Sequence, residues 1–257
     1  MLTVTGDRGR RRLTRRRAGP SHVDASQPVG PAGRRAGSLQ PMFWRILPHA
    51  TACFASEQIF LLDVRQDRYF LVPPRAAPAM ASWLHRGFAA APPPAVLTIL
   101  QQSGICREGD AEPTNALKER VQIPDGLSTA GHRGTSRSLV ITRRVMASWL
   151  RLRLSSLNAI VERRRWRPPF PIRGKDDAAI EVAAAFERSR SIVQIARNCL
   201  LDSIALDGLL AKREIGCQWV FGISPRPFAA HCWLQTQDVL LNDSFDHVSG
   251  FTPILAL

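Results

Sequence analysis

The sequence predicts an α+β fold. Short β-rich runs at 59–64 (IFLLDV) and 68–72 (RYFLV) indicate strands in the first half of the chain. Apolar residues at helical spacing at 143–165 and after Cys199 indicate helices in the second half. A further hairpin is expected between His231 and Asp243. Together these patterns predict a small β-rich unit ahead of a larger unit of helices and strands.

The first 41 residues differ in composition from the rest. They carry nine Arg against Asp7 and Asp24, which is half of the net charge of +14. They are rich in Pro, Gly and Ser and show almost no apolar periodicity, so 1–41 is expected to be a disordered, dispensable tail. The sequence leaves both Met1 and Met42 open as the start residue. Because the charge is concentrated here, a basic nucleic-acid-binding protein without enzymatic activity is an alternative that the charge alone supports only weakly.

The cysteine pattern and the hydropathy indicate in which cellular compartment the protein is expected. Five cysteines form no CxxC pair, and their odd number argues against a disulfide framework. No apolar core follows the basic N-terminal residues, as a secretory signal would require, and no apolar run is long enough to span a bilayer. A cytoplasmic location is the expectation.

Residues 42–106 are predicted to form one domain. The two β-rich runs are joined by RQD at 65–67 as a hairpin, and the stretch ILPHATACFA before them could supply a third strand. AAPAMASWLHRG (76–87) and PAVLTILQQSG (94–104) are predicted helices that end at Gly87 and Gly104.

A linker is expected at 107–142, which is rich in Gly, Pro, Ser, Thr and charge. The domain from 143 to 257 would then begin with one long amphipathic helix at 143–165. We expect its apolar stripe to pack on the core and its arginines to face solvent; the stripe consists of Met146, Leu150, Leu154, Leu157 and Val161. A second helix is predicted at 176–189, with Asp176 and Asp177 at its positive end.

Cys199 opens an apolar helical stretch, where free N–H groups and the helix dipole favour a thiolate. His231 and Asp243 are equidistant from Gln237, so a turn over 236–238 would place them directly opposite. Opposed residues have Cβ atoms roughly 4.5–5.5 Å apart, close enough for a carboxylate to hold an imidazole. A thiolate, a base and an orienting acid are the parts of a cysteine acyl-transfer site.

Other assignments were weighed for the same region. The backbone N–H of Cys199 is the expected oxyanion donor, and Gln194 could add a side-chain amide. Zinc is the rival reading, but His231 and Cys232 are adjacent on a strand and point to opposite faces. No metal site is therefore predicted. His247 and the remaining histidines are expected to be surface or structural residues.

At these residues a family resemblance emerges. The Cys-Leu at 199–200, VFGISPRPFAAHCWLQ at 220–235, VLLND at 239–243 and the ending FTPILAL resemble the transglutaminase-like leader peptidase of lasso peptide biosynthesis, the B protein. The resemblance covers roughly 144–257. Cys232 and Gln235 depart from its usual Ala and Glu. LLDVRQDRYFLV (61–72) resembles the small winged-helix, PqqD-like precursor-recognition domain of peptide-modifying systems.

These resemblances imply a transglutaminase/papain-like cysteine peptidase behind a leader-recognition domain of three strands and short helices. The enzyme would remove the leader from a ribosomally made precursor, and an asparagine-synthetase-like cyclase would then close a macrolactam. ATP dependence is implied for some such systems, but no phosphate-binding glycine loop is present, so no cofactor is assigned.

A leader could add as a strand to a sheet edge, and the expected contacts are Leu62, Asp63, Phe70 and Val72. For each apolar residue among them, a place in the core is the favoured alternative. Transfer of the acyl group to an amine, as in transglutaminases, also remains open.

Overall fold

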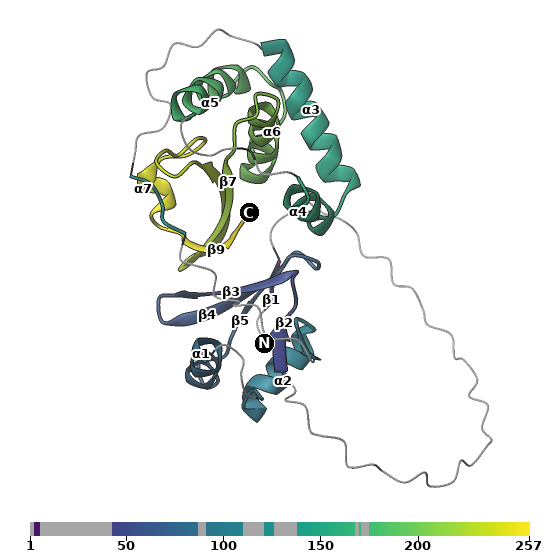
Figure 1. Cartoon of the computed structure of the whole chain (residues 1–257), viewed down its shortest axis with the longest axis vertical. Coiled ribbons are helices and arrows are strands. Elements are labelled where there is room, and N and C mark those ends of the chain that lie inside the picture. The colour runs from purple at the N-terminus through teal and green to yellow at the C-terminus, as the bar shows by residue number, and fades with distance from the viewer. Residues whose placement is uncertain are drawn as a thin grey trace, which may run out of the picture.

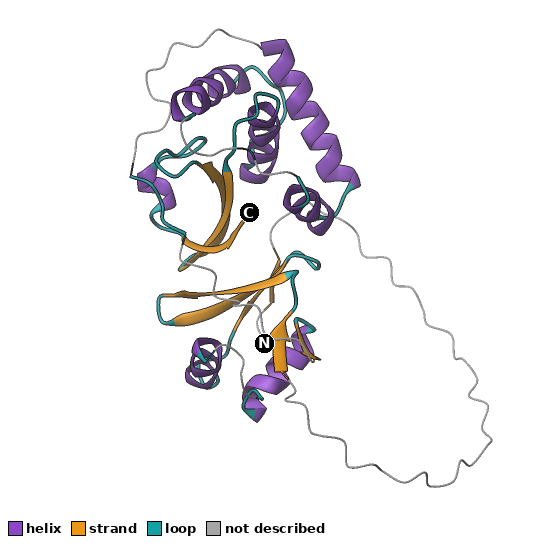
Figure 2. Ribbon diagram, viewed as in Figure 1, coloured by secondary structure: helices purple, strands orange, loops and turns teal. Residues whose placement is uncertain are grey.

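The computed structural model describes residues 3–5, 43–86, 91–109, 121–125, 138–167, 170 and 175–257. Figures 1 and 2 show two parts, one above the other: an N-terminal sheet with helices below it, and a C-terminal group of helices around a second sheet. This is the α+β arrangement expected from the sequence.

The N-terminal sheet has the strand order β1-β5-β4-β3 and is antiparallel throughout. Its bounds are Thr3–Thr5 for β1, Ala50–Ala55 for β3, Gln58–Asp63 for β4 and Arg68–Leu71 for β5. Helices α1 (Ala77–His85) and α2 (Pro94–Ser103) follow the sheet. The three predicted strands and both predicted helices are therefore present, and α2 ends at Gly104 with a left-handed φ of 66°. A winged-helix assignment for this part stays a prediction.

Two expectations for the flanking segments need correction. Within the expected tail, Thr3–Thr5 form a strand that pairs with β5, while the rest of that tail lies outside the described residues. Within the expected linker, β6 (Cys106–Gly109) pairs with β2 (Phe43–Ile46). Residues 121–125 also belong to the folded body, because Val121 and Ile123 pack against the C-terminal sheet.

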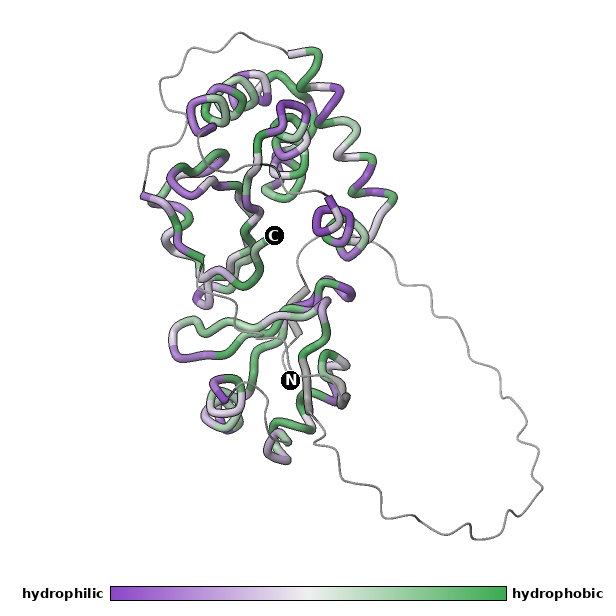
Figure 3. Tube along the Cα trace, in the orientation of Figure 1, coloured by the Kyte–Doolittle hydropathy of each residue, from purple (hydrophilic) through white to green (hydrophobic). Residues whose placement is uncertain are grey.

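Both faces of the N-terminal sheet are covered, because apolar side chains alternate in direction along each strand. Leu61, Phe70 and Val72 pack in a core with α1 and α2, whereas Phe60, Leu62 and Tyr69 belong to the core of the C-terminal part; the alternation thus places neighbouring residues in different cores. Figure 3 shows these strands as largely hydrophobic. The sheet is therefore an interior layer of the molecule.

The leader contacts expected from the sequence are consequently core or turn residues. Leu62, Phe70 and Val72 are buried, with 1%, 6% and 2% of their surface exposed. The buried Asp63 carboxylate accepts the backbone N–H groups of Arg65 (2.8 Å) and Gln66 (3.2 Å) and so closes the turn before β5. The expectation that these side chains face a peptide is wrong; strand addition through backbone atoms stays a prediction.

In the described residues of the C-terminal part there are four helices, a three-stranded sheet and a short fifth helix. The helices are α3 (Ser138–Leu154), α4 (Leu157–Arg165), α5 (Asp176–Arg190) and α6 (Cys199–Ala211). The sheet has the antiparallel order β8-β7-β9, with β7 at Gln218–Pro225, β8 at Phe228–Gln235 and β9 at Thr252–Ala256. Helix α7 covers Phe245–Val248. The predicted helix at 176–189 is confirmed as α5.

The single helix expected at 143–165 is instead two helices. Ser156 has extended backbone angles, and its hydroxyl caps α4 by accepting the Ala159 N–H at 3.2 Å. The buried face of α3 is formed by Ile141, Val145 and Ser148. The expected stripe is wrong in its first half: Met146, Leu150 and Leu154 are exposed, and only Leu157 and Val161 on α4 are buried. Helix α3 is apolar on two sides, so periodicity alone does not decide which side is buried.

The two parts of the molecule are joined by direct packing. Strand β3 lies beside β9, and the Thr51 hydroxyl donates to the carbonyl oxygen of Ile254 at 2.8 Å. The Phe228 ring lies 6.1 Å from Phe60 and 5.6 Å from Tyr69, measured between centroids. The N-terminal sheet is thus held against the C-terminal part by both an apolar core and a hydrogen bond. None of the described helices is long and apolar enough to cross a membrane.

Candidate active site

Cys199 is the first residue of α6, as predicted. Asn198 caps this helix: its backbone is extended, and its side-chain oxygen accepts the N–H groups of Leu200 (3.1 Å) and Leu201 (3.2 Å). An Asn directly before an apolar helical run is a recognisable N-cap signal, so this residue could have been found from sequence. The cap fixes the helix start and thereby the position of the Cys199 sulfur.

Helix α6 is also anchored by buried ion pairs. Arg190, 1% exposed at the end of α5, donates to the Asp202 carboxylate at 2.7 Å and to the carbonyl oxygens of Val193 and Ala196. These bonds tie the loop that leads into Cys199 to the first turn of α6. Further along the helix, Asp207 accepts both terminal nitrogens of Arg167, at 2.7 and 2.5 Å. Nothing in the local sequence singles out these contacts.

The sulfur of Cys199 lies against the edge of the C-terminal sheet. Strand β8 is the last strand of that sheet, and among the described residues its outer edge carries only the isolated bridge from Gln235 to Leu240. The Cys199 thiol lies close enough to the His231 side chain and to the backbone of Cys232 and Leu200 for these groups to influence its pKa. Burial on its own raises the pKa of the Cys199 thiol, but the bond and charge of His231 and the two backbone groups outweigh it, and the net pKa is lowered.

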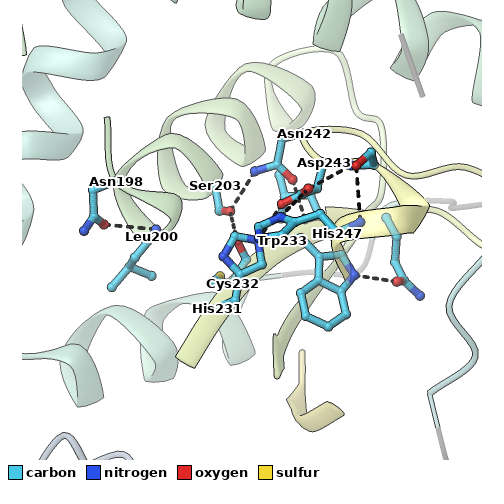
Figure 4. A network of polar contacts seen from close by, with 12 residues as sticks. Asn198, Leu200, Ser203, His231, Cys232, Trp233, Asn242, Asp243 and His247 are labelled. Atoms are coloured by element: carbon cyan, nitrogen blue, oxygen red, sulfur yellow. Dashed lines mark hydrogen bonds and ion pairs between the residues drawn. The ribbon is translucent and has the colours of Figure 1, made fainter. Parts of the chain in front are cut away.

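His231 connects the sulfur to Asp243. Its Nε2 lies 2.5 Å from Asp243 Oδ2, and both side chains are largely buried (Figure 4). Because an ionised carboxylate only accepts hydrogen bonds, Nε2 carries the proton and Nδ1 is left for the sulfur. Burial disfavours the charged imidazole, yet the bonds to Asp243 and Cys199 prevail and raise the pKa of His231 to about 9.

The Asp243 carboxylate is ionised in this setting. Burial on its own would raise its pKa, but the bonds from His231, the Ser244 N–H and His247 lower it below the ordinary value. A lowered thiol pKa, a raised imidazole pKa and a lowered carboxyl pKa together favour a thiolate–imidazolium pair held by a carboxylate. Such an arrangement can attack a carbonyl carbon and shuttle the proton to a leaving group.

The expected hairpin is only partly correct. Gln235 bridges to Leu240 rather than to Val239, and the Leu241 N–H donates to Leu234 O, so the register is shifted by one residue. The shift arises because the Thr236 hydroxyl accepts the Asp238 and Val239 N–H groups and builds a longer turn. The strand that pairs with β8 along its whole length is β7.

Next to Asp243, the Asn242 side chain provides hydrogen bonds where no regular strand pairing with β8 is formed. Its side-chain oxygen accepts the Leu234 N–H at 2.7 Å, and its amide nitrogen donates to the Ser203 hydroxyl at 3.0 Å. The Ser203 hydroxyl in turn donates to the Cys232 carbonyl oxygen at 3.3 Å (Figure 4). One amide thus links β8, α6 and the loop that carries Asp243, which the sequence analysis missed.

The remaining candidates have other surroundings. The Gln194 side chain is exposed in the loop before Cys199 and, among the described residues, makes no hydrogen bond; its oxyanion role stays a prediction. Gln235 is buried and accepts the Trp233 indole N–H at 2.8 Å, so it supports β8 from within. Arg197, also near the cysteine in sequence, pairs with Glu187 at 2.6 Å.

A metal ion is the competing use of the acid and the histidines. His231, Asp243 and His247 offer ligand atoms that lie within 4.8 Å of one another. The two N–O distances are 2.5 and 2.8 Å, which match hydrogen bonds, whereas two ligands of one zinc ion, each at about 2.0–2.1 Å from a tetrahedral centre, would lie farther apart. As arranged, these side chains are hydrogen-bonded to one another.

Comparison with family models gives one result for this part of the chain. Residues 142–256 match the model described as the transglutaminase-like superfamily. The match begins within α3, ends in β9 and includes Cys199, His231 and Asp243, so a cysteine-based enzyme is the general class that it supports. Searches of curated proteins and of solved structures gave no match.

Proposed function

We propose that this protein is a cysteine peptidase that binds the leader of a ribosomally made lasso peptide precursor and cleaves it from the core before macrolactam formation. The observation that carries the chemistry is the convergence of the Cys199 sulfur, the His231 ring and the Asp243 carboxylate from three separate segments. The motifs at 220–235, 239–243 and 251–257 supply the link to lasso peptide precursors.

The reaction follows from the protonation states. The Cys199 thiolate attacks the carbonyl carbon of the bond between leader and core. The oxyanion of the tetrahedral intermediate is stabilised by the Cys199 backbone N–H at the start of α6. The His231 imidazolium gives its proton to the departing amine, which breaks the peptide bond and leaves a thioester on Cys199. His231 then accepts a proton from water, which attacks the thioester and releases the leader, while Asp243 holds the imidazole in place.

The proposal includes partners. The released core would pass to an asparagine-synthetase-like cyclase, and ATP dependence of the combined reaction belongs to the same proposal. The test substrate is the short precursor peptide that this proposal expects to be encoded beside the gene. Wild-type protein is expected to release leader and core as two masses, and Cys199→Ala to release neither while still binding the full precursor.

A second acceptor is favoured by the superfamily match, since the same thioester can pass its acyl group to an amine instead of water. Incubation of the precursor with an added primary amine distinguishes the two. Hydrolysis leaves a free carboxylate on the leader, whereas acyl transfer adds the mass of the amine less one water. Cleavage by Cys199→Ala at the wild-type rate would remove both readings.

A further inference from the structure

Asp243 accepts hydrogen bonds from two histidines at once. Its Oδ2 faces His231 Nε2 at 2.5 Å, and its Oδ1 lies 2.8 Å from His247 Nδ1 and 2.8 Å from the Ser244 N (Figure 4). The chemistry proposed above uses only the first of these contacts. The second histidine is therefore unexplained by the reaction itself.

His247 is held in this position by its surroundings. His247 lies on α7, the short helix that Ser244 caps. The Ser244 hydroxyl accepts the His247 backbone N–H at 3.4 Å. Its ring lies 4.7 Å from the His231 ring and 5.5 Å edge-on from Phe251. About half of the His247 side chain is exposed, compared with 13% of Asp243, so His247 forms the solvent side of the carboxylate.

The direction of the bond defines what His247 can do. An ionised carboxylate accepts only, so His247 must donate through Nδ1–H. A carboxylate can rotate about its last side-chain bond, and two donors on Oδ1 fix that rotation so that Oδ2 faces His231. With only the Ser244 N–H left, water can compete for Oδ1 and the carboxylate is less firmly oriented.

We propose that His247 is a positioning residue that orients the Asp243 carboxylate and, through it, the His231 ring toward Cys199. The inference rests on the proposed function of the Cys199 site. His247 does not touch the sulfur; it determines how large a fraction of the molecules has His231 bonded to both Cys199 and Asp243. Partners that orient metal-binding side chains by hydrogen bonds commonly change affinity or activity by about 10–100-fold, and we expect an effect at the low end of this range here.

The test compares three substitutions at one position. The Asn side-chain nitrogen lies as many bonds from the backbone as Nδ1, so His247→Asn keeps the donor in place. His247→Gln places its nitrogen one bond farther away, and His247→Leu removes the donor. His85 serves as a control, because it is also exposed and its Nδ1 bonds a backbone carbonyl oxygen, that of Ala81, at 2.8 Å.

Two measurements separate this inference from the proposed function. The alkylation rate of Cys199 by iodoacetamide at neutral pH, in a background where the other four cysteines are Ala or Ser, reports the thiolate without any peptide. It is expected to fall about 10-fold in His247→Leu and to recover to within about 2-fold of wild type in His247→Asn. Precursor cleavage should show the same order in kcat with little change in KM.

The outcomes decide the matter in either direction. Alkylation of His247→Leu at the wild-type rate, or a folded His247→Asn as slow as His247→Leu, would overturn the positioning role. His85→Leu should leave the rate unchanged. If the wild-type protein fails to cleave the precursor but its alkylation still depends on the donor at position 247, the proposed substrate is wrong and the positioning role holds.

Discussion

Gly222 on β7 is paired directly with His231 on β8, and a Cβ atom at Gly222 would come within 2.7 Å of the Trp233 ring. Trp233 stacks on His231 at 6.0 Å between centroids. The same Cβ would also come to 3.0 Å from Phe251, which lies against His231 on another side. The bare backbone at Gly222 therefore leaves room for the two rings that support the imidazole.

Gly222→Ala is consequently expected to displace Trp233 and Phe251. Overpacking of this kind costs about 1–3 kcal/mol of unfolding free energy, and the shift of His231 should lower kcat as well. Urea unfolding and precursor cleavage would measure the two effects. Gly250→Ala is the matched control, because a Cβ there meets only the His247 carbonyl oxygen at 3.6 Å. Equal stability of both variants would contradict the packing argument.

The shifted pKa values predict a reactive thiolate at lower pH than for an ordinary thiol. Because the pKa of Cys199 is lowered and that of His231 is raised to about 9, the thiolate–imidazolium pair should exist below the ordinary thiol pKa and be lost as His231 deprotonates near pH 9. In the background that keeps only Cys199, the rate of alkylation measured against pH should therefore begin to rise at lower pH than for a free thiol.

Replacement of His231 provides the comparison. In His231→Ala the lowering bond and charge are gone while burial remains, so the alkylation profile should move to higher pH. A profile that is the same in both proteins would show that His231 does not control the thiol.

Asn242→Ala is expected to loosen the loop that carries Asp243. It leaves the Leu234 N–H without its partner and the Ser203 hydroxyl without a donor, at a cost of about 1–3 kcal/mol in unfolding free energy. The rate should fall too, since Asp243 is the next residue. Asn158→Ala is a suitable control, because Asn158 on α4 is half-buried and its side chain makes no hydrogen bond among the described residues. A chemical denaturation curve for each variant measures the difference.

Phe228→Ala tests the junction of the two parts. Phe228 contacts Phe60 and Tyr69, so its removal should cost roughly 2–4 kcal/mol and separate the unfolding of the N-terminal sheet from that of the C-terminal part. Calorimetry is then expected to show two transitions for Phe228→Ala and one for the wild type. Phe245→Ala, at an exposed ring, should leave a single transition. One unchanged transition in Phe228→Ala would mean that the junction does not depend on this ring.

The sequence predicts those features that local patterns determine. Cys199 at a helix start follows from an Asn and an apolar run, and the N-terminal strands follow from their β-rich composition. The register after β8 could not be read in this way, because the side chains of Thr236 and Asn242 take over backbone hydrogen bonds. His247 was missed for a related reason: only the fold brings it to Asp243.

The buried face of α3 also could not be predicted from the hydrophobic periodicity of the sequence. Met146 and Val145 both lie on apolar stripes, and the choice between them depends on what the neighbouring helices cover. The leader contacts expected on the N-terminal sheet failed similarly, since a second domain covers the face that carries Leu62. In both cases the missing information was the position of another part of the chain.

The shared core between the N-terminal sheet and the C-terminal part sets a length scale for the proposed substrate. The Thr51 hydroxyl is bonded to the Ile254 carbonyl oxygen and the Phe228 ring packs on Phe60, so the sheet is in direct contact with the part of the molecule that carries Cys199. If a peptide is bound on the N-terminal sheet and cleaved at Cys199, the distance between the binding place and the cleaved bond is fixed. The number of residues between grip and scissile bond, more than their identity, would then decide where the cut falls.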